Sequence, residues 1–346
     1  MTLPTWDTSL WDPMPGWLNT ASYGLPPRPA FEAMQEALAD WRVGATSWEP
    51  WDEATNRSRE GFAQLIGVDA ADVAAGSAVS QLLAPVAAAL PDNATVLVPE
   101  LEFTSNLFVW AAHHDRGVRV RAVPANRLAD SVTGDTDVVA FSLVQSATGE
   151  LAAYPDIVAA ARDRGAMVVV DATQACGWLP FDSTLADVVV VAAYKWLMSP
   201  RGTAFAYLAP ELRERLRPLQ AGWYAGQEPY ESFYGLPLRL AASARRFDIS
   251  PAWFCFIGTA PALEVVEKIG VAEIGAHNVA LANRFLAGLG KPPGHSAIVT
   301  VDVPDAERRL HDAGVRAAVR AGRVRASFHV YSTVDDVDMA LAALTP

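Results

Sequence analysis

The segment from Met167 to Leu208 constrains the fold of this chain more than any other part of the sequence. It contains three runs of apolar and largely β-branched residues: Met167–Val170, Val188–Val191 and Thr203–Leu208. Runs without polar alternation are typical of strands that are covered on both faces, as in the parallel sheets of α/β proteins. The segment therefore predicts the centre of an α/β fold with a buried sheet.

Two ionisable residues follow two of these runs. Asp171 ends the first run, and Lys195 lies just past the second. Each by itself would be an ordinary helix cap or a solvated side chain. The ends of neighbouring strands meet, however, at the crevice where α/β sheets bind ligands. A lysine enclosed by Tyr194 and Trp196 favours its neutral amine, which suits Schiff-base chemistry, and a nearby carboxylate suits the ring nitrogen of pyridoxal phosphate.

Two motifs stand in this stretch: DATQ at residues 171–174 and ADVVVVAAYKWL at residues 186–197. Together they resemble the class V aminotransferase superfamily, which includes cysteine desulfurases, kynureninases and isopenicillin N epimerase-like proteins. The resemblance implies pyridoxal phosphate as cofactor and fold type I. That fold has a large domain with a mostly parallel central sheet and a small C-terminal α/β domain, and it assembles as a homodimer.

The resemblance also divides the chain. We expect an N-terminal arm and helix at residues 1–45, a large pyridoxal phosphate-binding domain at 46–255 and a small C-terminal domain at 256–346. The spacing of apolar residues separately predicts helices at 29–42 and 52–66. Residues 244–270 match a region that the family uses as a loop crossing to the other subunit.

The resemblance assigns the cofactor contacts as well. Lys195 would hold pyridoxal phosphate and later act as general base, and Asp171 would keep the ring nitrogen protonated. The other implied contacts are Ser77, Ala78, Val79, Tyr194 and, from the other subunit, Ser250 at the phosphate, Phe103 stacked on the ring, and Gln145 and Gln174 near the phenolic oxygen. Without the family, Ser77 would only begin a helix, Phe103 would be core and Ser250 would sit in an ordinary turn.

The C-terminal sequence RASFHVYSTVDDVD resembles another class V signature. Arg325 is the position that binds the substrate α-carboxylate in that signature, and a guanidinium fork fits a planar carboxylate as a lysine does not. Near the N-terminus, LNTASYG resembles a substrate-side loop, which makes Asn19 and Ser22 candidate substrate contacts. An ordinary docked arm explains that segment equally well.

Composition excludes several classes of partner. The 346 residues carry a formal net charge of −12, which argues against a nucleic acid or an anionic membrane surface. No signal-peptide pattern or bilayer-spanning apolar run is visible, so a cytoplasmic location is expected. The two cysteines, Cys176 and Cys255, have neither a disulfide framework nor metal-ligand spacing, and no metal site is expected.

The same cysteines bear on the reaction. Desulfurases carry their persulfide-forming cysteine on a loop before the carboxylate-binding arginine. Here Arg320 is separated from Arg325 by four residues, none of them cysteine. We therefore expect a lyase that acts on a small amino-acid substrate by β-elimination or by cleaving a carbon–sulfur or carbon–carbon bond. A class V aminotransferase or epimerase is the first alternative, and a pyridoxal phosphate-binding protein without catalysis is the second.

Overall fold

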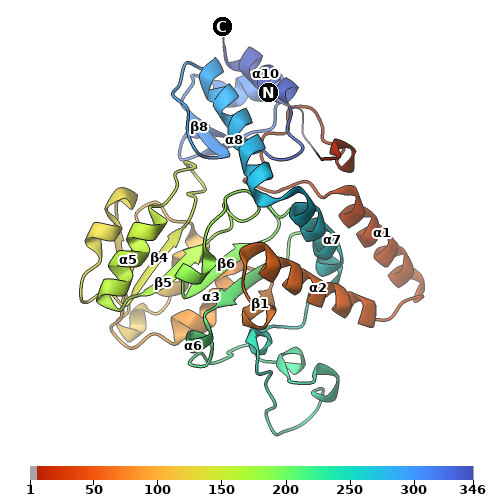
Figure 1. Ribbon diagram of the computed structural model, residues 1–346, viewed down its shortest axis with the longest axis vertical. Coiled ribbons are helices and arrows are strands. Elements are labelled where there is room, and N and C mark those ends of the chain that lie inside the picture. The colour runs from red at the N-terminus through yellow and green to blue at the C-terminus, as the bar shows by residue number, and fades with distance from the viewer. Residues whose placement is uncertain (1–5, 346) are drawn as a thin grey trace.

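The large domain is built on one seven-stranded sheet. A computed structural model describes residues 6–345 (Figure 1). The strands lie in the order β1-β7-β6-β5-β4-β2-β3. Their bounds are Val73–Gly76 for β1, Thr95–Pro99 for β2, Arg119–Val123 for β3, Val138–Ser142 for β4, Met167–Asp171 for β5, Val188–Ala192 for β6 and Ala204–Leu208 for β7. β7 runs antiparallel to both of its neighbours, β1 and β6, and the other strand pairs of the sheet are parallel, so the expected mostly parallel α/β sheet is confirmed.

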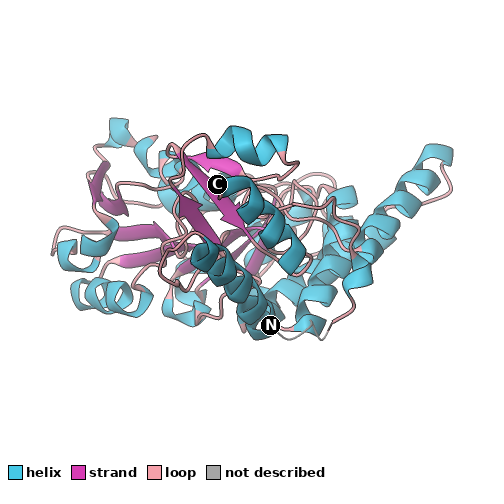
Figure 2. Ribbon diagram, turned by 90° about the horizontal axis from the view of Figure 1, so that it is seen from above, coloured by secondary structure: helices cyan, strands magenta, loops and turns pink. Residues whose placement is uncertain are grey.

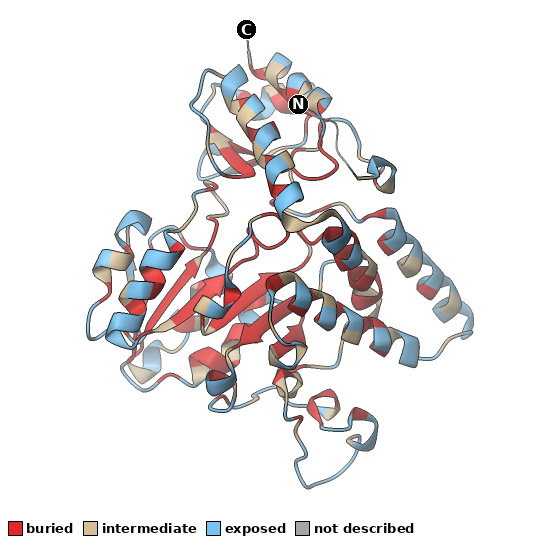
Figure 3. Ribbon diagram, viewed as in Figure 1, coloured by how far each residue is buried: buried red, intermediate tan, exposed pale blue. Residues whose placement is uncertain are grey.

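Helices cover both faces of this sheet (Figures 1 and 2). On one face α2 (Glu49–Ile66), α5 (Tyr154–Arg164) and α7 (Trp253–Ile269) pack against the strands, and on the other α3 (Val79–Ala88) and α4 (Phe108–Ala111) do so. Successive residues of β5 and β6 alternate between the two cores and are almost all buried (Figure 3). This burial on both faces explains why β5 and β6 are unbroken apolar runs in the sequence.

The small domain contains a three-stranded antiparallel sheet in the order β8-β10-β9. Its strands are β8 (Ile298–Val301), β9 (Ala318–Arg320) and β10 (Arg323–Ser327), and its helices are α8 (Val271–Gly288), α9 (Ala306–Asp312) and α10 (Val334–Leu344). These elements share a hydrophobic core of their own. In Figure 1 this domain lies above the large sheet, next to the C-terminal end of the chain.

Helix α7 joins the two parts of the molecule. Residues 244–270, implied to be a crossing loop, contain this seventeen-residue helix. It packs on α1 (Arg28–Val43) and α2 and then runs into α8. The expected boundary after residue 255 falls inside α7, and the division of the chain there stays a prediction. Among the described residues, no helix combines the length and the hydropathy needed to cross a membrane.

The N-terminal arm lies between the two sheets. Trp17 forms a bridge with Arg316, and Asn19 forms one with Ser327, so the arm extends the edge of the small sheet. Further along, the hydroxyls of Thr20 and Tyr331 lie 2.7 Å apart. The arm that the sequence showed only as an irregular segment is thus fixed on the C-terminal domain.

The buried side chain of His329 connects the small domain to the loop after β6 that carries Lys195. The side chain of His329 is fully buried, and its Nε2 lies 3.0 Å from the carbonyl oxygen of Trp196. Since a carbonyl only accepts, Nε2 carries the proton, and Nδ1 accepts from the amide nitrogen of Asn278 at 3.4 Å. Burial lowers the pKa of His329 to about 3. The folded chain therefore needs a neutral imidazole here.

This burial predicts acid sensitivity. The pKa of a histidine in the unfolded chain is near 6.5, whereas the pKa of His329 in the folded chain is about 3. Between these values the unfolded chain holds one more proton, so stability falls as the pH falls through the window. From pH 7 to pH 4 we expect the wild type to lose roughly 3 kcal/mol more of its free energy of unfolding than His329→Gln does. Urea titrations at each pH check this, and parallel pH profiles would contradict it.

Candidate active site

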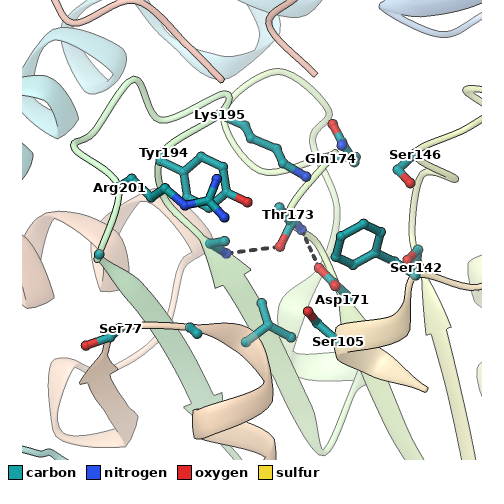
Figure 4. Close-up of a pocket in the computed structure, with 15 residues that line it drawn as sticks. Ser77, Ser105, Ser142, Ser146, Asp171, Thr173, Gln174, Tyr194, Lys195 and Arg201 are labelled. Carbon is teal, nitrogen blue, oxygen red and sulfur yellow. Dashed lines mark hydrogen bonds between the residues drawn. The ribbon is translucent and has the colours of Figure 1, made fainter. Parts of the chain in front are cut away.

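The carboxyl ends of β5 and β6 open into a cavity of about 340 Å³. A second cavity of about 560 Å³ adjoins it and shares several of its walls. The residues common to both are Phe103, Ser146, Gln174, Tyr194, Lys195 and Arg201. Figure 4 shows the first cavity, with Lys195, Thr173 and Asp171 facing one another across it. The strand ends that the sequence singled out therefore meet at one site.

Asp171 is fixed at the floor of the first cavity. Its side chain is only 4% exposed, and its Oδ1 accepts a hydrogen bond from the Thr173 amide at 2.8 Å. The Thr173 hydroxyl in turn accepts from the Ala192 amide at 3.0 Å, which ties the turn after β5 to β6. Burial raises the pKa of Asp171. Among residues 6–345 no donor bonds to Oδ2, so this oxygen is free for a protonated ring nitrogen.

Lys195 enters from the opposite wall. It is 6% exposed, and its Nζ lies 5.4 Å from the ring centre of Phe103 and 5.7 Å from that of Tyr194. Burial lowers the pKa of Lys195 to about 8, and Asp171 opposes this shift by attraction. An appreciable share of the amine is therefore neutral near physiological pH and able to act as a nucleophile or base.

The phosphate-binding candidates lie at the other end of the first cavity. Ser77, Ala78 and Val79 all line it at the start of α3. No side chain caps this helix, so the amides of its first turn are available to an anion. The Ser77 amide itself donates to the side chain of Gln81 at 3.1 Å. Tyr194 also lines this cavity, under the guanidinium of Arg201 at 4.7 Å.

Phe103 is placed as a ring-facing residue rather than as core. Its side chain is 44% exposed and lines both cavities. The preceding residue, Glu102, is buried and accepts from the Phe103 amide at 2.7 Å. It also accepts from the amide and the hydroxyl of Ser142, at 2.7 and 2.5 Å. Glu102 therefore locks the Phe103 turn onto the end of β4.

The two glutamines differ in position. Gln174 lines the first cavity, donates from Nε2 to the carbonyl of Ala21 at 3.0 Å and accepts from Trp196 Nε1 at 2.7 Å. Its second Nε2 hydrogen remains available to a ligand. Gln145 bonds to the carbonyl of Leu101 and lines the second cavity, but not the first cavity that contains Asp171. Of the two glutamines predicted to lie near the phenolic oxygen of the cofactor, only Gln174 lines the cavity that contains Asp171.

Arg325 forms one wall of the second cavity. It is 2% exposed, and it donates to the Ser146 carbonyl at 2.6 Å and to the Ser22 hydroxyl at 2.9 Å. Burial lowers its pKa to about 10. Its Nε is buried and has no hydrogen-bond partner among the described residues. Nε itself is shielded, but each terminal nitrogen has a second hydrogen beyond its bond to Ser146 or Ser22. Such a guanidinium beside a cavity is suited to a substrate carboxylate.

Of the three remaining predicted site residues, Ser22 lines a cavity, whereas Asn19 and Ser250 line neither of the two. Ser22 lines the second cavity, while Asn19 lies behind it and accepts from the Ser22 hydroxyl at 2.7 Å. Asn19 is therefore in a position to orient Ser22. Ser250 is exposed and lines neither cavity of its own chain.

Sequence reasoning missed several residues of these walls. They are Glu102, Ser105, Ser142, Ser146, Thr173 and Arg201. Ser142 ends β4 as Asp171 ends β5, so the strand-end argument would have found it. Arg201 carries no such signal, because only the folded loop after β6 turns it towards the cavity. No group of three or more metal-ligating side chains that could hold an ion occurs among the described residues.

Comparisons with known proteins agree with this architecture. The family described as aminotransferase class V matches residues 26–311. Similar curated proteins include an uncharacterized aminotransferase, YcbU, of Bacillus subtilis, 26% identical over 94% of this chain and 92% of its own length. The isopenicillin N epimerase of Streptomyces clavuligerus is 29% identical over 86% of this chain and 80% of its own. These matches confirm the resemblance indicated by the motifs.

Solved structures show the same fold. A cysteine desulfurase from Thermococcus onnurineus superposes with a TM-score of 0.82 at 22% identity, covering 95% of this chain and 93% of that one. A variant of C-DES, with glycine covalently linked to its PLP cofactor, gives 0.86 at 20% identity over 95% and 96%. The expected fold type I is confirmed.

The lowered pKa of Lys195 predicts selective reactivity. In protein freed of cofactor, trace acetylation of Lys195 should rise with a midpoint near pH 8, because the neutral amine is the reacting form. Peptide mapping after labelling across pH 6–11 measures this, with the exposed Lys268 and Lys291 as internal references. A midpoint for Lys195 near 10.4, the usual value for lysine, would contradict the effect of burial.

Proposed function

Because this chain belongs to the class V aminotransferase family, we propose that it is a lyase that removes a β-substituent from an amino acid. One observation carries the proposal. Lys195 lines the cavity that holds Asp171 and also the adjoining cavity that holds Arg325. A single amine is therefore positioned between a site for a ring nitrogen and a site for a carboxylate.

The cofactor expected from the sequence, pyridoxal phosphate, is confirmed by membership of this family. The walls fit it, since Oδ2 of Asp171 lacks a donor among residues 6–345 and the first turn of α3 lacks a side-chain cap. When bound, the group supplies an electron sink for the bonds at a substrate α-carbon. Asp171 would hold the ring-nitrogen proton, and Phe103 would cover one ring face.

The chain's own residues then divide the work on the substrate. Arg325 would hold the α-carboxylate through the hydrogens of its two terminal nitrogens that Ser146 and Ser22 leave free. The neutral amine of Lys195 would take the α-proton, and the β-substituent would leave with the electron pair of its bond to the β-carbon. Protonated Lys195 would return a proton to the β-carbon, and water would replace nitrogen at the α-carbon, which releases a keto acid and ammonia.

The persulfide route of desulfurases receives no support from the cysteines. Between Arg320 and Arg325 the chain makes a hairpin whose turn, Ala321 and Gly322, has φ of +48° and +75° and reaches no further than two residues. Burial raises the pKa of Cys176 to about 12, and burial also raises that of Cys255. Both thiols therefore resist forming the nucleophilic thiolate.

Transamination and epimerisation begin with the same proton transfer at the α-carbon. The same residues would serve them, so the released product decides between these reactions and elimination. A binding protein without turnover would have no use for an amine with a pKa near 8 beside the substrate cavity.

The deciding experiment identifies products. Cofactor-loaded protein incubated with β-chloro-L-alanine should release pyruvate, ammonia and chloride in equal amounts. The double variant Cys176→Ala, Cys255→Ala should retain this activity, because neither thiol is needed for elimination. Loss of activity in a folded, cofactor-loaded double variant would contradict the lyase assignment. Racemisation of β-chloro-L-alanine, or formation of a keto acid that keeps the chlorine, would also contradict it.

A matched control addresses the electron sink. Asp171→Asn preserves the shape of the side chain but no longer holds the ring-nitrogen proton. It should bind the cofactor and lose most of its turnover. An unimpaired Asp171→Asn enzyme would contradict the role given to this carboxylate.

We also propose a homodimer in which Ser250 contacts the cofactor phosphate of the other subunit. The segment before it is firmly held: buried Asp248 pairs with Arg59 at 2.5 Å and accepts from the Ala75 amide at 2.8 Å. Ser250 itself is exposed. A loop that is anchored at Asp248 and presents an exposed hydroxyl suits a contact with a second chain.

The expected result is a dimer in sedimentation experiments at micromolar concentration. Ser250→Ala should release cofactor faster on dialysis while the chemistry of the loaded enzyme changes little. A fully active, cofactor-retaining monomer would contradict the shared site.

A further inference from the structure

We infer that the substrate carries a second negatively charged group, which Arg201 and Arg320 bind. The inference rests on the proposed function, because it concerns the same site. Arg201, Arg320 and Arg325 all line the second cavity, together with Lys195. One α-carboxylate occupies Arg325 and leaves the other two arginines without a counterion.

The concentration of positive charge runs against the composition of the chain. The whole protein has 27 lysines and arginines against 39 acidic residues. Three of those arginines nevertheless line this one cavity beside Lys195, and Glu102 is the only carboxylate among the described residues of its wall. Glu102 is engaged by Ser142 and by the Phe103 amide, so it is not turned towards an arginine. The cavity wall is therefore suited to an anionic ligand.

The two remaining arginines have donors to offer. The Arg201 guanidinium carbon lies 4.7 Å from the centre of the Tyr194 ring, and Arg201 lines both cavities. Within the described part of the chain, the Arg320 side chain donates only to the carbonyl of its neighbour Val319, at 2.8 Å. Among residues 6–345 no carboxylate forms an ion pair with either. A planar fork with free donors binds carboxylate, sulfonate or phosphate groups in two-point geometry.

Both arginines also lie near the reacting amine. Arg325, Arg201 and Arg320 each act to lower the pKa of Lys195 through charge repulsion. Arg201 and Arg320 are both exposed residues, so solvent screens part of this repulsion. The cations thus converge on the place where the substrate must sit, and an anion bound among them would relieve their mutual repulsion.

The cofactor phosphate does not account for the set. Its candidate site lies at the start of α3, with Ser77, Ala78 and Val79. Arg320 lines the second cavity and not the first, whereas Arg201 lines both. Arg320 is therefore the cleaner probe of a substrate charge, and Arg201 needs a separate measurement of cofactor retention.

The test compares matched amino acids on the cofactor-loaded enzyme. The absorbance of the cofactor is titrated with L-aspartate against L-asparagine and with L-glutamate against L-glutamine. The wild type should bind the acidic member of at least one pair roughly tenfold more tightly, as expected for one charge-assisted hydrogen-bonded pair. Arg320→Gln and Arg201→Gln should each bring this ratio towards one.

Arg323→Gln is the matched control. Arg323 belongs to the same hairpin, carries the same charge and is exposed, but it lines neither cavity. Its substitution should leave the wild-type ratio in place. A ratio that falls equally in all three variants would overturn the inference, because it would reflect net charge alone.

The outcomes also separate this inference from the proposed function. If amides and acids bind equally while both change the absorbance, the second anion site is wrong and the amino-acid enzyme stands. If no amino acid in the panel and no β-chloro-L-alanine changes the absorbance, the proposed function itself fails. If Arg201→Gln only speeds cofactor loss on dialysis and leaves the ratio intact, the assignment of Arg201 to the substrate is wrong.

Discussion

A close contact between the N-terminal arm and the loop after β6 is the constraint on which the site depends. The Gly24 amide donates to the carbonyl of Tyr194 at 2.9 Å. A Cβ atom on Gly24 would lie 2.0 Å from the carbonyl oxygen of Lys195, so no other residue fits without moving that loop. The backbone that carries the reactive amine is therefore held by a segment far from it in sequence.

The same arm reaches the other two groups that define the site. The Ala21 carbonyl accepts from Gln174 at 3.0 Å, and the Ser22 hydroxyl accepts from Arg325 at 2.9 Å. Gln174 belongs to the large domain and Arg325 to the small one. The N-terminal arm thus sets the distance between Gln174, which would face the cofactor ring, and Arg325, which would hold the substrate carboxylate. Such fixed geometry is what makes an amine, a carboxylate and a guanidinium act together.

Burial gives the site its electrostatic character. Lys195, Asp171 and Arg325 are each less than 7% exposed, and burial is the largest influence on the pKa of all three. In such surroundings a charge without a partner is costly, and each of these groups keeps capacity for a ligand. Arg325 shows this directly, because each of its terminal nitrogens makes one hydrogen bond and keeps a second hydrogen. The pocket is arranged for a ligand that supplies the missing charges.

The sequence by itself determined the central strands and the residues at their ends. Unbroken β-branched runs demand burial on both faces, and this local property placed Asp171 and Lys195 at the crevice. The motif around Arg325 likewise lies within a short stretch. Only the tertiary structure decided that Arg201 and Arg320 line the same cavity and that Gln145 stays away from Asp171. It also decided that the N-terminal arm packs through Gly24 against the backbone of Lys195. These arrangements depend on contacts between distant segments, and neither residue spacing nor hydrophobic period encodes such contacts.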